Sequence, residues 1–372
     1  MSDGEKDTPA RSARQWVVVR GTSMDLRVGA GILSEFPSIL RSAAGRPHAC
    51  ALVHEAAAPE EAVRVLHDNL CDQGFRVSAL PLGEVGCNLS EVERLSTMLR
   101  DARITADDIV LAVGGLETLS VASFACSSWC GGTRLAEVPL DLESAVVAAT
   151  TPRALDAAGL ERILAQEATA RYTMIDLDLV DFDPASEETR LAFALMVQTA
   201  MCDSDRAFGK LWDAADDLAA GDVAALVTQL QETLKGRGRI SSATSAALRQ
   251  SLEFGTTFAD ALVSVTGGAV SRSTALADGM RFASRLGVAQ ETLSIDDMLA
   301  VDEVLERLGL PTTSVPVDAD ALAARIREER FLRSSRFMLA VPRALGRVRL
   351  AVMTDELIEE HTGAWCASRP QP

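Results

Sequence analysis

Two carboxylates and one lysine could carry out acid–base or covalent chemistry in this sequence. Glu253 and Asp260 lie in one short segment of a chain that is rich in arginine. They could act as general bases, with a pKa set by burial and by neighbouring guanidinium groups, or they could form plain ion pairs with arginines. Lys235 is one of only three lysines. A lysine that is desolvated among cations could form a Schiff base.

Histidine and cysteine do not form a recognisable metal motif. Only four histidines occur, none close in sequence to the two carboxylates: His48, His54, His67 and His361. The seven cysteines include no paired motif. Cys126 and Cys130 are interpreted as buried small side chains rather than as zinc ligands. This odd number of unpaired thiols suggests a reducing, cytoplasmic environment.

A glycine pair could approach a phosphate group. Gly114-Gly115 follows a β-rich segment and precedes a helical one, and backbone amides at such a helix N-terminus bind anions. Glu117 and Asp141 add negative charge nearby. A like charge about 6 Å from a phosphate costs roughly 2–3 kcal/mol at an effective dielectric constant of about 20. Glu117 could instead be an ordinary helix N-terminal carboxylate.

The first half of the chain alternates short strands with helices, which predicts a mainly parallel sheet with helices on both faces. Strands are expected at residues 16–20, 49–54, 75–80, 108–113 and 134–138, and helices at 31–43, 59–74, 90–102 and 117–127. Ligands of such sheets lie at the carboxyl ends of the strands. Here these ends carry Glu84, the glycine pair and the segment after Pro139.

The second half reads as helical almost throughout. Helices are expected at residues 187–202, 204–218, 222–235, 242–265 and 273–286, with Ser294 as a helix N-cap and a β-hairpin over 336–341 and 346–352. The predicted fold is therefore α/β plus α. We expect a disordered tail over 1–15, a Rossmann-like domain over 16–182, and a helical domain with a C-terminal hairpin over 183–372, with a cleft between the domains.

Composition excludes several partners. The 372-residue chain has 48% hydrophobic residues and a net charge of −17. Nucleic acids and anionic membranes need a basic surface, so neither is expected as a partner. No apolar run reaches the roughly 18–20 residues that would span a bilayer, and the N-terminus lacks a secretory signal.

Several short segments, in order along the chain, resemble the 3-dehydroquinate synthase family. Residues 251–262 resemble the family's metal-binding segment L-N-F-G-H-T-F-G-H-A, with Thr256 and Asp260 in place of its histidines. The other matching segments are residues 81–84, 113–115, 137–139, 172–181 and 336–346. The resemblance implies a Rossmann-like domain followed by a helical domain, a bound NAD, and a zinc or cobalt ion.

The resemblance also implies that the metal ligands are missing. The family holds its ion through one Glu and two His, and the aligned motifs place Leu195, Thr256 and Arg272 at these three positions. An apolar group, a weak neutral ligand and a cation would not hold a divalent ion. We therefore expect no metal.

The implied NAD site keeps some features and lacks others. Glu84 and Glu55 match acidic positions of the family, and Gly114 and Gly115 match its glycines. However, Cys87, Ser120 and Leu140-Asp141 replace a lysine, an aspartate and two threonines. We expect no cofactor, although NAD stays open as an alternative.

On the implied substrate side, Lys235 and Arg249 keep the family's spacing of two carboxylate-binding residues. Arg153 and Arg330 stand near two family lysines, and Arg272 adds a further cation. A surface lysine near a helix end is the alternative for Lys235.

The predicted function is a metal-free, non-redox, lyase- or cyclase-like enzyme acting on a small carboxylate or phosphate in specialised biosynthesis. Lys235, Glu253 and Asp260 are the candidate catalytic residues. Arg249, Arg272, Arg153 and Arg330 are the candidate substrate-binding residues. Two alternatives remain open, a non-catalytic dimeric partner or ligand sensor and an active NAD- and metal-dependent cyclase. The resemblance further implies a homodimer.

Overall fold

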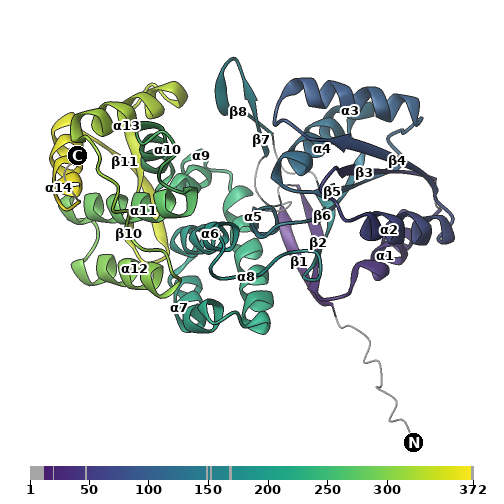
Figure 1. Cartoon of the computed structure of the whole chain (residues 1–372), viewed down its shortest axis with the longest axis horizontal. Coiled ribbons are helices and arrows are strands. Elements are labelled where there is room, and N and C mark those ends of the chain that lie inside the picture. Colours follow the sequence, from purple (N-terminus) through teal and green to yellow (C-terminus); the bar gives the residue numbers. More distant parts are fainter. Residues whose placement is uncertain are drawn as a thin grey trace, which may run out of the picture. The chain divides into compact units, whose positions relative to one another are not determined.

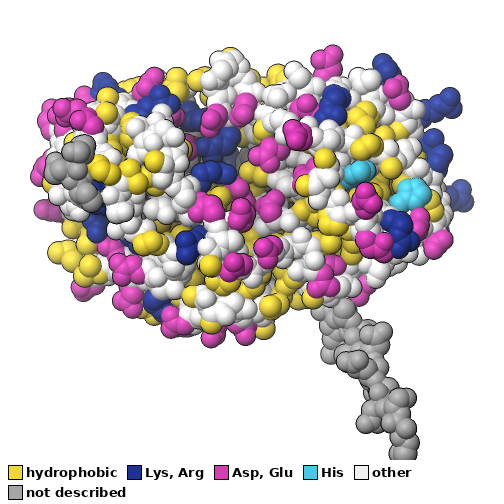
Figure 2. Space-filling view, viewed as in Figure 1, with side chains coloured by type: hydrophobic (Ala, Val, Ile, Leu, Met, Phe, Trp, Pro, Cys, Tyr) yellow, Lys and Arg dark blue, Asp and Glu magenta, His cyan; other side chains and the backbone are white. Residues whose placement is uncertain are grey.

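The computed structural model describes residues 12–19, 21–46, 48–147, 150, 153–166 and 170–369. The chain divides into two compact units, with the main division between Asp181 and Phe182. Residues 18–21 group with the second unit. Across the described residues, no helix combines the length and apolar character needed to cross a bilayer. Figure 2 shows acidic and basic side chains interspersed on the visible face.

Unit 1 is built on a seven-stranded sheet in the order β1-β2-β9-β6-β5-β3-β4. Every neighbouring pair from β2 to β4 is parallel, which confirms the predicted mainly parallel sheet. Its strands are β1 (Ala13–Val19), β2 (Thr22–Gly29), β3 (Ala49–Glu55), β4 (Arg76–Gly83), β5 (Ile109–Gly114), β6 (Arg134–Pro139) and β9 (Ala170–Asp176). A separate antiparallel hairpin joins β7 (Arg153–Ala157) to β8 (Leu160–Gln166).

Helices cover both faces of this sheet, as predicted. Figure 1 shows α1 and α2 on one face and α3 and α4 on the other. The helical segments are η1 (Leu33–Glu35), α1 (Phe36–Ala44), α2 (Glu60–Asp72), α3 (Leu89–Asp101), α4 (Leu116–Ser128), η2 (Trp129–Gly131) and α5 (Leu142–Val147). All six residues of β5 are buried, because a central parallel strand is covered on both sides.

Unit 1 contains elements that the sequence did not predict. Strand β1 begins at Ala13, so the predicted tail over 1–15 is too long, and residues 1–11 lie outside the described residues. Strand β2 was missed because Asp25 interrupts its apolar pattern. This carboxylate is buried, and Arg14 donates two hydrogen bonds to it, at 3.0 and 2.8 Å. The β7–β8 hairpin was also missed.

Unit 2 is mainly helical and ends in the predicted hairpin of β10 (Met338–Ala344) and β11 (Arg347–Val352). The Ser294 hydroxyl accepts from the Asp297 amide and caps α12, as predicted. The helical segments are α6 (Glu187–Asp203), α7 (Asp205–Ala219), α8 (Val223–Ser241), α9 (Ala246–Arg249), η3 (Gln250–Glu253), α10 (Thr256–Val265), α11 (Arg272–Ala289), α12 (Ile295–Arg307), α13 (Ala319–Arg333) and α14 (Asp355–Ala367).

The single helix predicted over 242–265 is wrong. The chain instead forms α9, the short η3 turn and then α10, which begins at Thr256. Gly255 has φ +82°, a left-handed conformation that ends the preceding turn. A Cβ atom on Gly255 would lie 2.7 Å from the Met280 nitrogen, and one on Gly279 would lie 2.1 Å from the Gly255 oxygen. Two glycines therefore let the start of α10 touch the backbone of α11.

Candidate functional site

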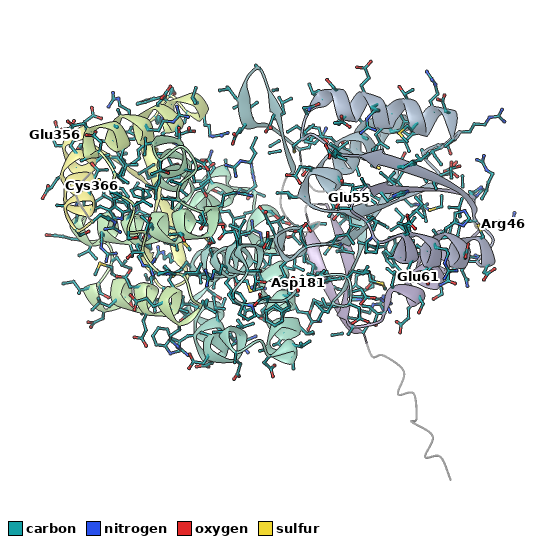
Figure 3. All side chains as sticks on the ribbon, in the orientation of Figure 1. Arg46, Glu55, Glu61, Asp181, Glu356 and Cys366 are labelled. Carbon is teal, nitrogen blue, oxygen red and sulfur yellow. The ribbon has the colours of Figure 1, made fainter. Side chains whose placement is uncertain are left out.

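In unit 1, the turn between β5 and α4 is occupied by a side chain of the protein. Oε2 of Glu55, at the carboxyl end of β3, accepts hydrogen bonds from the Gly115 amide and the Thr118 hydroxyl, each at 2.8 Å. Figure 3 labels Glu55 on unit 1. Sequence reasoning placed Glu55 near a cofactor. In the structure its carboxylate caps the helix N-terminus, where an anionic ligand would otherwise bind.

A second carboxylate lies against the same turn. Oδ2 of Asp141 is 2.8 Å from the place where a Cβ atom on Gly115 would be, and Oδ1 accepts from the Ser144 amide at 2.6 Å. Burial raises the pKa of Asp141, and the nearby charges of Glu55 and Glu117 raise it further against the hydrogen bonds from Ser144. The turn therefore concentrates negative charge.

Asp141→Asn is expected to stabilise the protein at neutral pH. Because the folded-state pKa of Asp141 is raised above its unfolded value of about 3.9, the charged form opposes folding as pH rises through this window. Asparagine keeps an acceptor for the Ser144 amide and removes the charge. We expect the unfolding midpoint to rise at pH 7 by roughly 2–4 °C, the shift that about 1 kcal/mol produces in a domain of this size. At pH 3 the difference should vanish. Calorimetry across this pH range measures both, and an equal shift at both pH values would contradict the charge explanation.

The other candidate cofactor residues have different surroundings. Glu84 is exposed just after Gly83, at the end of β4. The Cys87 thiol, which the resemblance places at a lysine of the family, donates to the Ala154 carbonyl at 3.2 Å. Cys126 is buried and Cys130 is exposed, and no disulfide joins the seven cysteines, all of which lie in the described part of the chain.

In unit 2, we consider the three residues that the sequence resemblance places at metal-ligand positions, Leu195, Thr256 and Arg272. Leu195 is half-buried on α6. The Gln198 amide, one turn further along α6, donates to the Phe254 carbonyl at 2.8 Å and to the Thr256 hydroxyl at 3.3 Å. A neutral amide–hydroxyl pair thus lies where the resemblance places a ligand histidine.

Arg272 is exposed at the first residue of α11. In the part of the chain that the structure describes, no three His, Cys, Asp or Glu side chains are grouped so that they could hold a metal ion. One apolar group, one hydroxyl engaged by an amide and one guanidinium do not fit the oxygen, nitrogen and sulfur donors that zinc or cobalt needs.

Two predicted site residues do come together. The buried Arg330 guanidinium on α13 donates from Nη1 to Oε2 of Glu253 at 2.9 Å. Burial raises the pKa of Glu253, and the charge of Asp260 raises it further, whereas Arg330 and Arg333 lower it. We call Glu253, Asp260, Arg330 and Arg333 the Glu253 cluster.

The remaining predicted cations are placed differently. Lys235 is half-buried on α8 and makes no hydrogen bond or ion pair with another described residue. Arg249 donates from Nη1 to the carbonyls of Ala243 and Thr244, at 2.6 and 3.1 Å, so part of its guanidinium holds its own loop. Arg153 begins β7, and its side chain lies outside the described part of the structure.

Sequence reasoning missed two buried polar residues near these positions. Gln198 interrupts an apolar run on α6, which is the signal that could have identified it. Arg237 on α8 is buried and donates to the Thr199 hydroxyl at 2.8 Å. The local sequence around Lys235 does not indicate that Arg237 is buried, because packing against α6 in the folded chain is what buries it.

Comparison with known proteins agrees with this architecture. Residues 192–330 match the model of the 3-dehydroquinate synthase C-terminal domain. The 3-dehydroquinate synthase of Gloeobacter violaceus is 25% identical over 297 residues, which cover 75% of this chain and 79% of that protein. The enzyme of Thermobifida fusca is 35% identical over 135 residues, which cover 35% of this chain and 36% of that protein.

Solved structures show the same fold. A 2-deoxy-scyllo-inosose synthase in complex with carbaglucose-6-phosphate, NAD+ and Co2+ has a TM-score of 0.79 at 15% identity, covering 94% of this chain and 99% of that one. The 2-epi-5-epi-valiolone synthase of Streptomyces hygroscopicus, with NAD+ and Zn2+ bound, has a TM-score of 0.76 at 17% identity, covering 96% of this chain and 100% of that one.

The chain shares with these two structures a fold in which a Rossmann-like unit is followed by a helical unit. Residues 192–330 therefore belong to the 3-dehydroquinate synthase C-terminal domain family, and the chain as a whole is similar to 3-dehydroquinate synthases.

Proposed function

We propose that this chain is a divergent member of the family that acts on a small carboxylate or phosphate substrate without metal and without redox chemistry. The observation that carries the proposal is the hydrogen bond from Gln198 to Thr256. This bond occupies the Thr256 hydroxyl, which the resemblance places at a metal-ligand position. The residues at the other two such positions are Leu195 and the exposed Arg272. With no fitting donor set, catalysis would depend on the protein's own acids, bases and cations.

The Glu253 cluster offers such groups. A carboxyl whose pKa is raised by burial can hold and release a proton closer to neutral pH than an ordinary glutamate. When Glu253 is protonated, the two arginines outnumber the one remaining carboxylate, Asp260. That local excess of positive charge favours a small anion in a protein that is acidic overall. Lys235, which has no described partner, would add a further cation.

Lys235→Ala is expected to weaken the binding of carbaglucose-6-phosphate by about tenfold or more, the effect of losing one charge-assisted hydrogen bond. Lys210→Ala is the matched control, because Lys210 already pairs with Glu232 at 2.8 Å on the same unit. Titration calorimetry on protein treated with a chelator would measure both variants, with inorganic phosphate as a second probe. Equal affinities for the two variants would remove Lys235 from the site.

A turnover assay on the same chelator-treated protein distinguishes the functions that the sequence left open. Turnover of a sugar phosphate, followed by NMR in the presence of chelator and without NAD+, is the expected result. Turnover that requires added zinc or cobalt together with NAD+ would instead identify an active cyclase of the usual kind. Binding without turnover would favour the ligand sensor, and the absence of both binding and turnover would favour the non-catalytic partner.

The predicted homodimer remains a proposal that rests on the family resemblance. Sedimentation velocity of the full chain is expected to give one species of twice the chain mass, and a monomer at micromolar concentration would contradict it.

A further inference from the structure

We infer that Glu55 is an intramolecular anion that occupies the position of a dinucleotide pyrophosphate in unit 1, so that the β5–α4 turn is closed to NAD by the chain's own side chain. The inference rests on the proposed non-redox function and gives the closed turn as the reason why NAD does not bind. It concerns unit 1 only, whereas the proposed substrate site lies in unit 2.

The backbone amide at the β5–α4 turn is already hydrogen-bonded to a side chain of the protein. Gly115 is the N-cap of α4, and backbone amides at such a position bind phosphate oxygens in dinucleotide-binding folds. Here the Gly115 amide donates to Oε2 of Glu55 at 2.8 Å, and the Thr118 hydroxyl donates to the same oxygen. The amide that would face a pyrophosphate is therefore already bonded to a carboxylate.

Two carboxylates also fill the space beside the glycine pair. Oε2 of Glu55 lies 2.6 Å from the place where a Cβ atom on Gly114 would be, and Oδ2 of Asp141 lies 2.8 Å from the corresponding place on Gly115. The space that glycine leaves free beside the backbone is thus taken by two carboxylates. A pyrophosphate would have to displace Glu55 and would still lie beside Asp141.

The negative charges at the turn would also repel a phosphate. At a separation of about 6 Å, each carboxylate repels a phosphate enough to lower affinity by roughly thirtyfold to a hundredfold or more. Glu117, exposed in the first turn of α4, adds a third negative charge. These carboxylates come from three separate segments, so the charge of the turn is a product of the fold.

The test measures NAD+ binding by titration calorimetry to the wild-type chain, to Glu55→Ala, and to the double variant with Glu55→Ala and Asp141→Asn. We expect no detectable binding to the wild type and a gain of at least about tenfold per carboxylate removed. Glu61→Ala is the matched control, because it removes one negative charge from an exposed ion pair with Arg64 on α2 of the same unit (Figure 3). It is expected to gain nothing.

Glu55→Gln keeps the test decisive if the alanine variants fail to fold. Its amide oxygen can still accept from Gly115, so it should remain folded and gain less than Glu55→Ala. Micromolar binding of NAD+ to the wild type would overturn both this inference and the non-redox proposal. Absence of binding to the wild type and to every folded variant would overturn this inference alone.

Discussion

Replacing Asp278 by alanine is expected to lower the free energy of unfolding by about 3–5 kcal/mol, the usual cost of leaving a buried charge without its partner. Asp278 on α11 is fully buried. Its Oδ2 accepts from the Thr313 amide at 2.9 Å, and its Oδ1 lies 3.6 Å from Arg281 and 3.7 Å from Arg369.

Burial explains the size of this effect. It raises the pKa of Asp278 and lowers the pKa of both Arg281 and Arg369, because each charged form has lost water. Without Asp278, two poorly solvated guanidinium groups would face each other across the space that it vacates. The Thr313 amide would also lose its acceptor, and a buried unpaired donor is itself destabilising.

Chemical denaturation of Asp278→Ala, Asp278→Asn and Asp216→Ala measures the contribution of the charge. Asparagine keeps an acceptor for Thr313 and should lose less than alanine. Asp216 pairs with Arg307 at 2.9 Å, but its side chain is 75% exposed, so its removal should leave the midpoint unchanged. An Asp278→Ala midpoint as high as that of Asp216→Ala would mean that the network contributes nothing to stability.

Gly279→Ala is expected to destabilise the protein by about 3 kcal/mol or more, the upper range for forcing extra volume into a packed interior. The new methyl group would lie 2.1 Å from the Gly255 oxygen, which is a backbone atom and cannot rotate away. The start of α10 would have to move away from α11, taking Thr256 and Asp260 with it.

Gly209→Ala on α7 provides the control, since a Cβ atom there would have no neighbour within 4 Å. It should be neutral or stabilise the helix by about 0.5–1 kcal/mol, the ordinary preference for alanine within a helix. Thermal unfolding of both variants checks the pair. Similar midpoints for Gly279→Ala and Gly209→Ala would show that the two helices separate easily.

Much of the fold could be predicted from the sequence because its signals are local. The apolar run of β5 and the periodic helices between strands indicate a parallel sheet, and Ser294 marks the start of α12 by its type alone. Strand β2 could not be found in this way. Its Asp25 is compatible with a buried strand only because Arg14 from the neighbouring strand pairs with it.

The candidate site also has features that the local sequence shows and features that only the folded structure shows. The sequence by itself determined which chemical groups are present and which of them the resemblance places at family positions: Leu195, Thr256 and Arg272 at metal-ligand positions, and Gly114-Gly115 before a helix. Only the tertiary structure decided which groups neutralise one another, as in the Glu253–Arg330 pair and the bond from the Gly115 amide to Glu55. Residue types and local periodicity are properties of the local sequence, whereas burial and charge pairing depend on segments that meet only after folding.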